Sequence, residues 1–314
     1  MKELIISLLA ISLSLPTMAQ TRTVNLRVIE TSDVHGSFFP YDFINQKPKE
    51  GSLARVVTYV DSLRTKYGDH LILLDNGDIL QGQPTCYYCN YVKTDQPNVA
   101  ASVVNYMRYD AETMGNHDVE TGHPVYDKWI KEVKCPILGA NIVSSQTKQP
   151  YVHPYTIIKR DGVKIAVLGM ITDAIPNWLN ENLWKGLYFD NMVKSCRYWV
   201  NYLKTHEQPN LIIGLFHSGK EGGIHNEKFD ENASMEVAKQ VPGFDLILYG
   251  HDHTLHQDVV KNDITGKDVL CLDPSCNALY VSDAQISLTV SDGESPVTLK
   301  TNVTGQLVNV CNEV

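Results

Sequence analysis

The sequence predicts an α/β fold in which helices flank mixed β-sheets and a β-rich segment forms the C-terminal part. Short β-branched runs alternate with segments of helical periodicity from residue 24 to about residue 250, as in chains built from strand–helix–strand units. After Gly250 the strands follow one another without helices. A composition of 43% hydrophobic and 20% charged residues supports a large core and excludes intrinsic disorder.

The N-terminal residues have the pattern of a signal peptide. Lys2 precedes an apolar run over residues 4–15, and Pro16 and a small residue, Ala19, complete a cleavage site. The run is shorter than the ~20 residues that a membrane span needs, and no cysteine at the cleavage point offers a lipid attachment site. We therefore expect residues 1–19 to be removed, a periplasmic or secreted protein without a membrane anchor, and one domain over residues 20–314.

The elements expected before residue 140 follow from the spacing of apolar residues and from residues such as proline that favour the ends of helices. Residues 25–30 form a β-branched strand, and residues 52–66 carry an apolar stripe at every third or fourth position, which predicts a helix. Pro97 suits the start of a second helix. The remaining elements expected in this part are a buried strand at 71–74, the helix at 97–106, a strand at 112–114, a helix at 125–133 and a strand at 136–138.

Further along, three nearly continuous apolar runs predict strands that are covered on both faces. They are residues 164–170, 211–216 and 245–249, with helices expected at 191–204 and 233–240. The C-terminal part alternates apolar and polar residues, which is typical of antiparallel strands with one solvated face. The strands expected there are 268–272, 279–281, 284–290 and 296–301.

Seven cysteines are too few for a disulfide scaffold. Cys86 and Cys89 have redox-motif spacing, but no obvious amphipathic helix follows them, so we expect a local structural disulfide rather than a thioredoxin-like site. Cys271 and Cys276 either bridge a turn or stay as buried thiols.

Five clusters of metal-binding residue types each follow a predicted strand. Ligands bind at the carboxyl ends of strands in open α/β sheets, so clusters that are distant in sequence can meet in one crevice. Carboxylate, imidazole and amide ligands suit Zn²⁺, Mn²⁺ or Fe²⁺. The clusters are Asp33-Val34-His35, Gly77-Asp78, Gly115-Asn116-His117-Asp118, His217 and Gly250-His251-Asp252-His253.

The order of these clusters resembles that of the calcineurin-like metallophosphoesterases. The strings ETSDVHG, GDILQGQP, GNHDVE and YGHDH are similar to the secreted 5′-nucleotidase branch, which includes UDP-sugar hydrolases and cyclic-nucleotide phosphodiesterases. The resemblance covers roughly residues 24–290 and implies a four-layer sandwich of mixed sheets and helices.

The resemblance also implies two divalent ions, Zn, Mn or Fe, about 3.5–4 Å apart, and attack on phosphorus by a hydroxide that both ions share. It places Asp33, His35 and His253 on the first ion, Asn116, His217 and His251 on the second, and Asp78 between them.

His117 is not a ligand in this assignment. The resemblance implies that it faces the leaving-group oxygen, where it stabilises the transition state or donates a proton. The acidic partner expected three positions later is Glu120 instead of the family's usual Asp. Asp118 is the alternative partner or a group that holds the turn, and either acid could instead be a solvated loop residue.

The implied function is that of a secreted dimetal phosphoesterase acting on nucleotides, similar to 5′-nucleotidases. Cyclic-nucleotide phosphodiesterase or nucleotide-sugar diphosphatase activity is the alternative, and a non-catalytic metal-binding subunit of a two-chain complex is the alternative of another class. With 27 basic and 36 acidic residues the net charge is −9, which argues against long nucleic acid as a partner.

The full-length nucleotidases of that branch append a second domain for nucleotide recognition. The chain ends at Val314, so we expect that domain to be absent from this polypeptide. Either a separate chain supplies it, or the site accepts looser substrates through its own loops. The insertion at 81–96 offers Tyr87, Tyr88 and Tyr91, which could stack a ring or form a disulfide-pinned surface loop or docking face.

Overall fold

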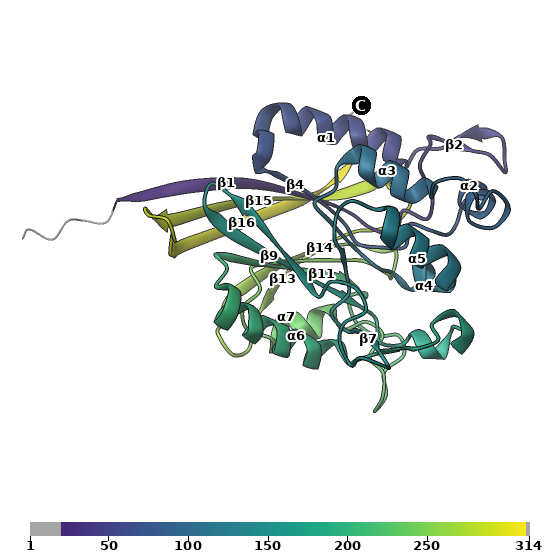
Figure 1. Cartoon of the computed structure of the whole chain (residues 1–314). Coiled ribbons are helices and arrows are strands. Elements are labelled where there is room, and N and C mark those ends of the chain that lie inside the picture. The colour runs from purple at the N-terminus through teal and green to yellow at the C-terminus, as the bar shows by residue number, and fades with distance from the viewer. Residues whose placement is uncertain (1–19, 312–314) are drawn as a thin grey trace, which may run out of the picture.

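The structure, a computed structural model that describes residues 20–311, is built of four layers (Figure 1). Two six-stranded sheets pack face to face, and helices cover the outer face of each sheet. The predicted α/β class and the four-layer sandwich are confirmed. The predicted signal peptide at 1–19 lies outside the described residues.

The first sheet has the strand order β16-β15-β1-β4-β5-β6. Four strands run parallel, namely β1 (Thr21–Thr31), β4 (Leu71–Asp75), β5 (Ala111–Thr113) and β6 (Ile137–Leu138). Two antiparallel strands complete it, β15 (Tyr280–Ser291) and β16 (Thr298–Asn309). The helices packed on its outer face are α1 (Leu53–Tyr67), α3 (Val99–Met107) and α5 (His123–Glu132).

The second sheet has the order β13-β14-β12-β11-β9-β8. Its parallel strands are β9 (Val163–Ile171), β11 (Leu211–His217), β12 (Leu246–Tyr249) and β14 (Asp268–Pro274). Antiparallel strands β8 (Tyr155–Arg160) and β13 (Leu255–Lys261) form its edges. The outer face is covered by α6 (Met192–Tyr202) and α7 (Ser234–Gln240).

The remaining elements are short and lie in the connections. Two small sheets pair β2 (Tyr41–Asp42) with β3 (Lys47–Pro48), and β7 (Ile142–Ser144) with β10 (Leu187–Phe189). Helical turns are α2 (Pro84–Tyr87), α4 (Asn116–Glu120), the 3-10 turns η1 (Gly68–His70), η3 (Ile175–Asn177) and η4 (Glu181–Leu183), and the π-helical turns η2 (Tyr88–Val92) and η5 (Leu203–Glu207).

The core between the sheets is built from alternate residues of their strands. Val24, Leu26 and Val28 of β1 contribute to it, and Ile165 and Val167 contribute from β9. Because side chains alternate across a strand, the intervening residues of the central strands face the helices, so both faces are buried. This double burial explains why the central strands are nearly continuous apolar runs.

Capping residues set the helix starts. The side chains of Ser52, Asn98 and Asn191 accept hydrogen bonds from backbone N–H groups three residues later. The predicted helices at 52–66, 97–106 and 191–204 therefore exist, but each begins one or two residues later than expected. The predicted helices at 125–133 and 233–240 match α5 and α7 closely.

The strand predictions near the C-terminus need correction. The strands expected at 279–281 and 284–290 form one element, β15, because β1 and β16 pair with it continuously on its two sides. The strand expected at 296–301 extends to Asn309 as β16. The edge strands β8 and β13 were not predicted, and neither was the one-turn helix α4.

The expected Cys86–Cys89 disulfide is wrong, because each of the seven cysteines is a free thiol. Cys86 is buried and its Sγ lies 3.6 Å from the carbonyl oxygen of Ile79, so the thiol points into the core. Cys271 is buried within β14, which agrees with the alternative of a buried thiol.

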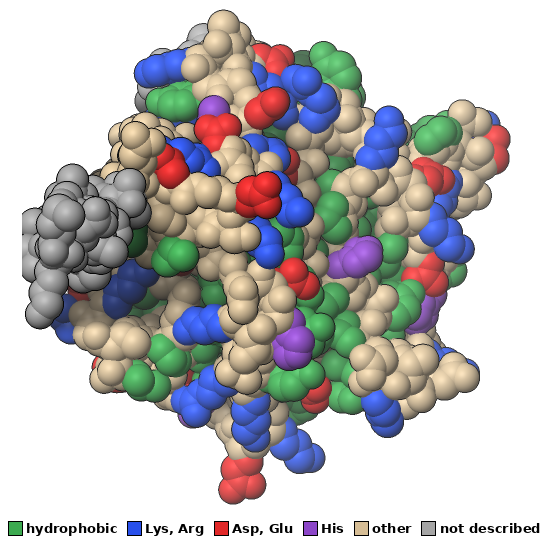
Figure 2. Space-filling model, turned by 60° about the vertical axis from the view of Figure 1, so that its left-hand side comes forward, with side chains coloured by type: hydrophobic (Ala, Val, Ile, Leu, Met, Phe, Trp, Pro, Cys, Tyr) green, Lys and Arg blue, Asp and Glu red, His purple; other side chains and the backbone are tan. Residues whose placement is uncertain are grey.

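The surface carries both charge signs. On the face shown in Figure 2, basic and acidic side chains are interspersed and do not form a continuous basic surface. Among residues 20–311, no helix has both the length and the apolar character needed to cross a membrane.

A buried ion pair joins β1 to β15. The guanidinium of Arg27 contacts the carboxylate of Asp283, which also accepts a hydrogen bond of 2.5 Å from Tyr59 of α1. Arg27 is 7% exposed and Asp283 is fully buried. Replacing Arg27 with Met would leave a buried carboxylate without its counter-charge.

We expect Arg27→Met to lower the free energy of unfolding by about 3–5 kcal/mol, measured by denaturant titration. Arg22→Met is the matched control, because that guanidinium is partly exposed and pairs loosely with Asp292 at 3.7 Å. The control should change stability by less than about 1 kcal/mol. Equal effects of the two substitutions would contradict a structural role for the buried pair.

Candidate metal centre

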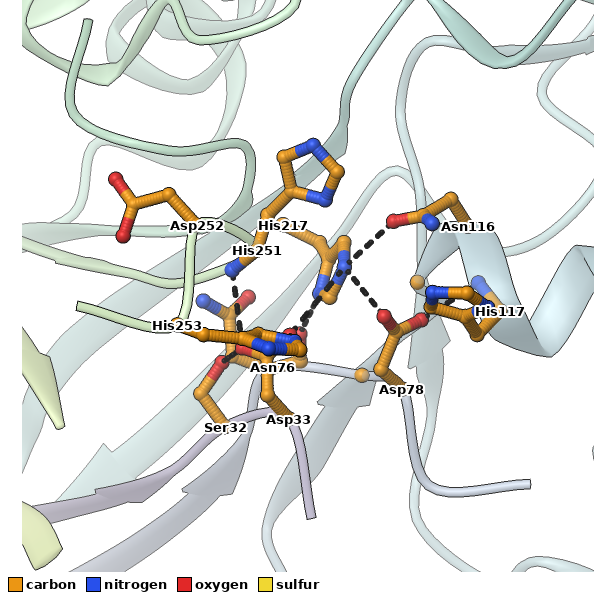
Figure 3. Close-up of polar contacts among 12 residues, drawn as sticks. Ser32, Asp33, Asn76, Asp78, Asn116, His117, His217, His251, Asp252 and His253 are labelled. Atoms are coloured by element: carbon orange, nitrogen blue, oxygen red, sulfur yellow. Dashed lines mark hydrogen bonds and ion pairs between the residues drawn. The ribbon is translucent and has the colours of Figure 1, made fainter. Parts of the chain in front are cut away.

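The predicted metal ligands come together where the strands of both sheets end (Figure 3). They extend from the loops after β1, β4 and β12, from the first residue of α4 and from the last residue of β11. This is the carboxyl edge at which α/β sheets bind ligands. The residues brought together are Asp33, His35, Asp78, Asn116, His217, His251 and His253.

The loops that carry them have unusual backbone conformations. Asp33, Asp78 and His251 have φ values of 51°, 57° and 84°, in the left-handed region that non-glycine residues rarely adopt. Neighbouring glycines allow close approach. A Cβ at Gly115 would lie 2.1 Å from Asp78 Oδ1, and a Cβ at Gly250 would lie 2.5 Å from Asp33 Oδ2. The glycines of the sequence motifs are therefore required by the packing around the two carboxylates.

Four of the side chains form a compact group. One ligand atom from each of Asp33, His35, Asp78 and His253 lies within 4.8 Å of all the others. His253 Nε2 is 3.2 Å from Asp33 Oδ1, and His35 Nε2 is 3.9 Å from Asp78 Oδ2. These distances fit a shared cation better than four separate polar contacts.

A second group adjoins the first at Asp78. His217 Nε2 lies 3.2 Å from Asp78 Oδ2 and 3.0 Å from Asn116 Oδ1. The rings of His217 and His251 have centroids 5.4 Å apart, and His251 Nε2 is 3.3 Å from Glu231 Oε1. Asp78 therefore contacts both groups, while His251 is turned toward Glu231.

The electrostatics of the site fit a divalent metal. Asp33 Oδ1 and Asp78 Oδ2 are buried and receive no hydrogen bond of good geometry, although an imidazole nitrogen lies 3.2 Å from each, His253 Nε2 and His217 Nε2 respectively. Burial would raise the pKa of Asp78, but the nearby His217 and His35 outweigh it and lower that pKa. Burial likewise opposes charge on His217, yet Asp78 and Asp33 raise its pKa to about 10. Two carboxylates that require positive charge, surrounded by imidazoles, form a donor set suited to Zn²⁺, Mn²⁺ or Fe²⁺.

His117 and Glu120 form a pair at the edge of the site. The backbone N–H of His117 donates to Asp78 Oδ1 over 2.8 Å, and its ring is 5.3 Å from that of His35. Its Nδ1 lies 2.5 Å from Glu120 Oε2. The bond occupies Nδ1, so Nε2 is the nitrogen available for proton exchange.

The position of Asp118 differs from the one expected of a catalytic residue. It is fully buried, and its carboxylate accepts four backbone hydrogen bonds of 2.8–2.9 Å, from the N–H groups of Asp78, Ile79, Leu80 and Gly115. Both oxygens are thereby used to hold the turn that carries Asp78. Of the two roles expected for Asp118, its position supports the structural one, and Glu120 is the partner of His117.

Three residues of the site were not foreseen from the sequence. Ser32 donates to Asp33 Oδ2 over 2.5 Å, and the carbonyl oxygen of Asn76 lies 2.6 Å from His217 Nδ1. Ser32 directly precedes Asp33, and Asn76 lies two residues before Asp78. This closeness to a motif aspartate is the signal that could have identified both residues. Glu231 lies in the long connection between β11 and α7, where the sequence carries no such signal.

We expect Asp118→Ala to reduce the free energy of unfolding by about 3 kcal/mol or more, because it leaves several buried N–H groups unpaired. Glu120→Ala, on the same helix but with a partly exposed side chain, should change stability by about 0.5 kcal/mol or less. Denaturant titration of both variants checks this. A mild effect of Asp118→Ala would argue against the structural role.

Comparison with known proteins places the chain in a family. The calcineurin-like phosphoesterase family matches residues 26–255. A 2′,3′-cyclic-nucleotide 2′-phosphodiesterase/3′-nucleotidase from Yersinia enterocolitica is 29% identical over 281 residues, covering 85% of this chain and 42% of the relative. Protein UshA from the same species is 30% identical over 236 residues, covering 73% of this chain and 40% of the relative.

A solved structure agrees over nearly the whole chain. The calcineurin-like phosphoesterase YfkN from Bacillus subtilis superposes with a TM-score of 0.80 at 25% identity, covering 93% of each chain. The chain spans about two fifths of the length of the curated relatives above. With the family match over residues 26–255 and the ligand order described above, the chain belongs to the calcineurin-like phosphoesterase family.

Proposed function

We propose that this protein is an exported, metal-dependent phosphoesterase that hydrolyses phosphate esters of nucleotides. The observation that carries the proposal is the convergence of seven metal-type side chains around the buried carboxylates of Asp33 and Asp78, next to a His–Glu pair. Family membership supports the reaction class. The signal-peptide pattern of residues 1–19 supports export.

In the proposed centre, the ligands divide between two divalent ions. When bound, such ions lower the pKa of a water molecule and neutralise charge on the phosphoryl oxygens. Asp78 lies between the two groups of side chains and would contact both ions. The first ion is assigned Asp33, His35 and His253, and the second Asn116, His217 and His251.

His117 is proposed to act on the leaving group. Its Nε2 would donate a proton to, or stabilise charge on, the departing oxygen. Glu120 holds Nδ1 at 2.5 Å, which fixes the ring orientation and leaves Nε2 free to face the leaving group. The Glu found here in place of the family's usual Asp therefore still reaches the ring.

Names of the relatives support nucleotides as the substrate class. They include a 2′,3′-cyclic-nucleotide 2′-phosphodiesterase/3′-nucleotidase and a 5′-nucleotidase from Vibrio cholerae. Nucleotide monoesters and cyclic diesters are both small phosphate esters that fall within this substrate class. The net charge of −9 argues against long nucleic acids in the same site.

The proposal predicts metal-dependent hydrolysis. Protein stripped with a chelator should lose its activity on a chromogenic phosphate ester, and added Mn²⁺ or Zn²⁺ should restore it, with about two ions bound per chain by elemental analysis. Metal binding without any hydrolysis across nucleotide and chromogenic esters would instead identify a non-catalytic metal-binding subunit.

Replacing His117 with Ala should reduce turnover by about 10²–10⁴-fold while metal content stays unchanged. Asp78→Ala is the contrasting variant, since it removes the carboxylate between the two groups and should lower metal content as well as turnover. Elemental analysis alongside steady-state kinetics separates the two effects. Loss of bound metal from the His117 variant would show that His117 is a ligand.

A further inference from the structure

Three tyrosines are exposed on the helical turns that follow the Asp78 loop. Tyr87 ends α2, and Tyr88 and Tyr91 belong to η2. Tyr87 is 65% exposed, and the other two are each 50% exposed. The rings of Tyr87 and Tyr91 lie 5.4 Å apart between centroids, at an interplanar angle of 48°. Grouped exposed aromatic side chains of this kind mark binding surfaces more often than scattered ones.

This segment is fixed to the metal centre. Cys86 is buried next to Ile79, and Asn90 donates from Nδ2 to the carbonyl oxygen of Leu80 over 2.8 Å. Ile79 and Leu80 directly follow Asp78 and are held by Asp118. The tyrosines therefore project from a turn that is anchored on its inner side to the loop of the central carboxylate.

Tyr91 lies on the same side of the site as His117. Its hydroxyl donates to the carbonyl oxygen of Thr121 over 3.4 Å, and Thr121 directly follows Glu120, the partner of His117. Partial burial and the nearby Glu120 carboxylate raise the pKa of Tyr91. The contacts thus run from Asp78 to His117 and Glu120, and Tyr91 joins this chain at the neighbouring residue Thr121, with Tyr87 beside it.

We infer that Tyr87 and Tyr91 stack against the planar ring of the substrate's leaving group, so that this chain recognises nucleosides with its own residues. The inference rests on the proposed function for its geometry. With a phosphate at the metal ligands and His117 at the leaving oxygen, the leaving group would lie on the His117 side, where Tyr91 contacts Thr121. Stacking on aromatic side chains accepts any base, because every base presents a π-face. The substrate class is therefore nucleotides of broad base identity.

Trp178 is a second exposed aromatic side chain near the site, and it serves as the comparison for the two tyrosines. Its ring lies 5.6 Å from that of His251 and it is 39% exposed. It adjoins the other end of the ligand set, on the His251 side and not on the His117 side. A ring that bound there would depend on Trp178 and not on the two tyrosines.

Binding of adenosine, which carries the ring but no phosphate, tests the inference without requiring catalysis. The double variant Tyr87→Leu, Tyr91→Leu should raise the Kd for adenosine about tenfold in calorimetric titration of metal-loaded protein. Tyr91→Phe should retain most of the affinity, and ribose should bind to neither protein. Tyr198→Leu on α6, which removes a 61% exposed tyrosine from the other helix layer, is the matched control and should leave the Kd unchanged.

An unchanged Kd in the double variant, or a rise caused by Trp178→Leu instead, would overturn the inference. Circular dichroism melting of each variant shows whether it is folded. Because these tyrosines are largely exposed, the substitutions should leave the melting temperature nearly unchanged.

Hydrolysis of 5′-AMP and ribose 5-phosphate, which differ only in the base, supplies the second readout. The double variant should raise KM for 5′-AMP about tenfold and leave kcat/KM for ribose 5-phosphate unchanged. An equal loss for both esters would show that the tyrosines only support the loop, and the inference would be wrong. If wild-type protein hydrolyses neither ester while adenosine binding still depends on the tyrosines, the proposed 5′-nucleotide hydrolysis is wrong and the ring site stands.

Discussion

The rest of the site depends on two buried carboxylates, Asp33 and Asp78. Their inward oxygens are buried and face imidazole nitrogens at 3.2 Å without a hydrogen bond of good geometry, so positive charge is needed at this point to balance them. Asp33 comes from the first sheet, whereas His217 and His253 come from the second. The contribution of His217 and His253 to the charge balance therefore exists only when the two sheets are packed. This links assembly of the four-layer fold to assembly of the centre.

Much of the surrounding structure holds these two side chains in place. The peptide N–H of His251 donates to Asp33 Oδ2, and that of His117 donates to Asp78 Oδ1. Asp118 fixes the Asp78 turn from behind through backbone hydrogen bonds. The loops keep the strained backbone at the ligands because several such hydrogen bonds fix each loop in one conformation. The motifs thus encode a carboxylate-holding scaffold as well as the ligands themselves.

The sequence predicted the features that depend on local pattern. A parallel strand that is buried on both faces contains almost only apolar residues, and polar residues begin in the loop that follows it. Both the strand and the polar residues at its end can therefore be predicted from the sequence. The edge strand β13 escaped prediction because its pairing with β14, and not its composition, makes it a strand. The role of Asp118 was ambiguous for a similar reason, since only the folded turn shows which N–H groups face it. Glu231 meets His251 through a loop whose course no local pattern specifies.

Two pairs of buried carboxyl groups near the site differ in their charge. Burial raises the pKa of Asp75 to about 8 and that of Asp273 to about 11, so both stay largely protonated near neutral pH. Burial acts on Asp33 and Asp78 in the same direction, yet their pKa values are lowered, because His217 and neighbouring imidazoles face them. At the centre itself, histidine placement therefore outweighs burial. Asp33 and Asp78 thus carry negative charge where a cation can use it, and the contact with His251 likewise lowers the pKa of Glu231 at the edge of the site, whereas the neutral Asp75 and Asp273 add no competing attraction.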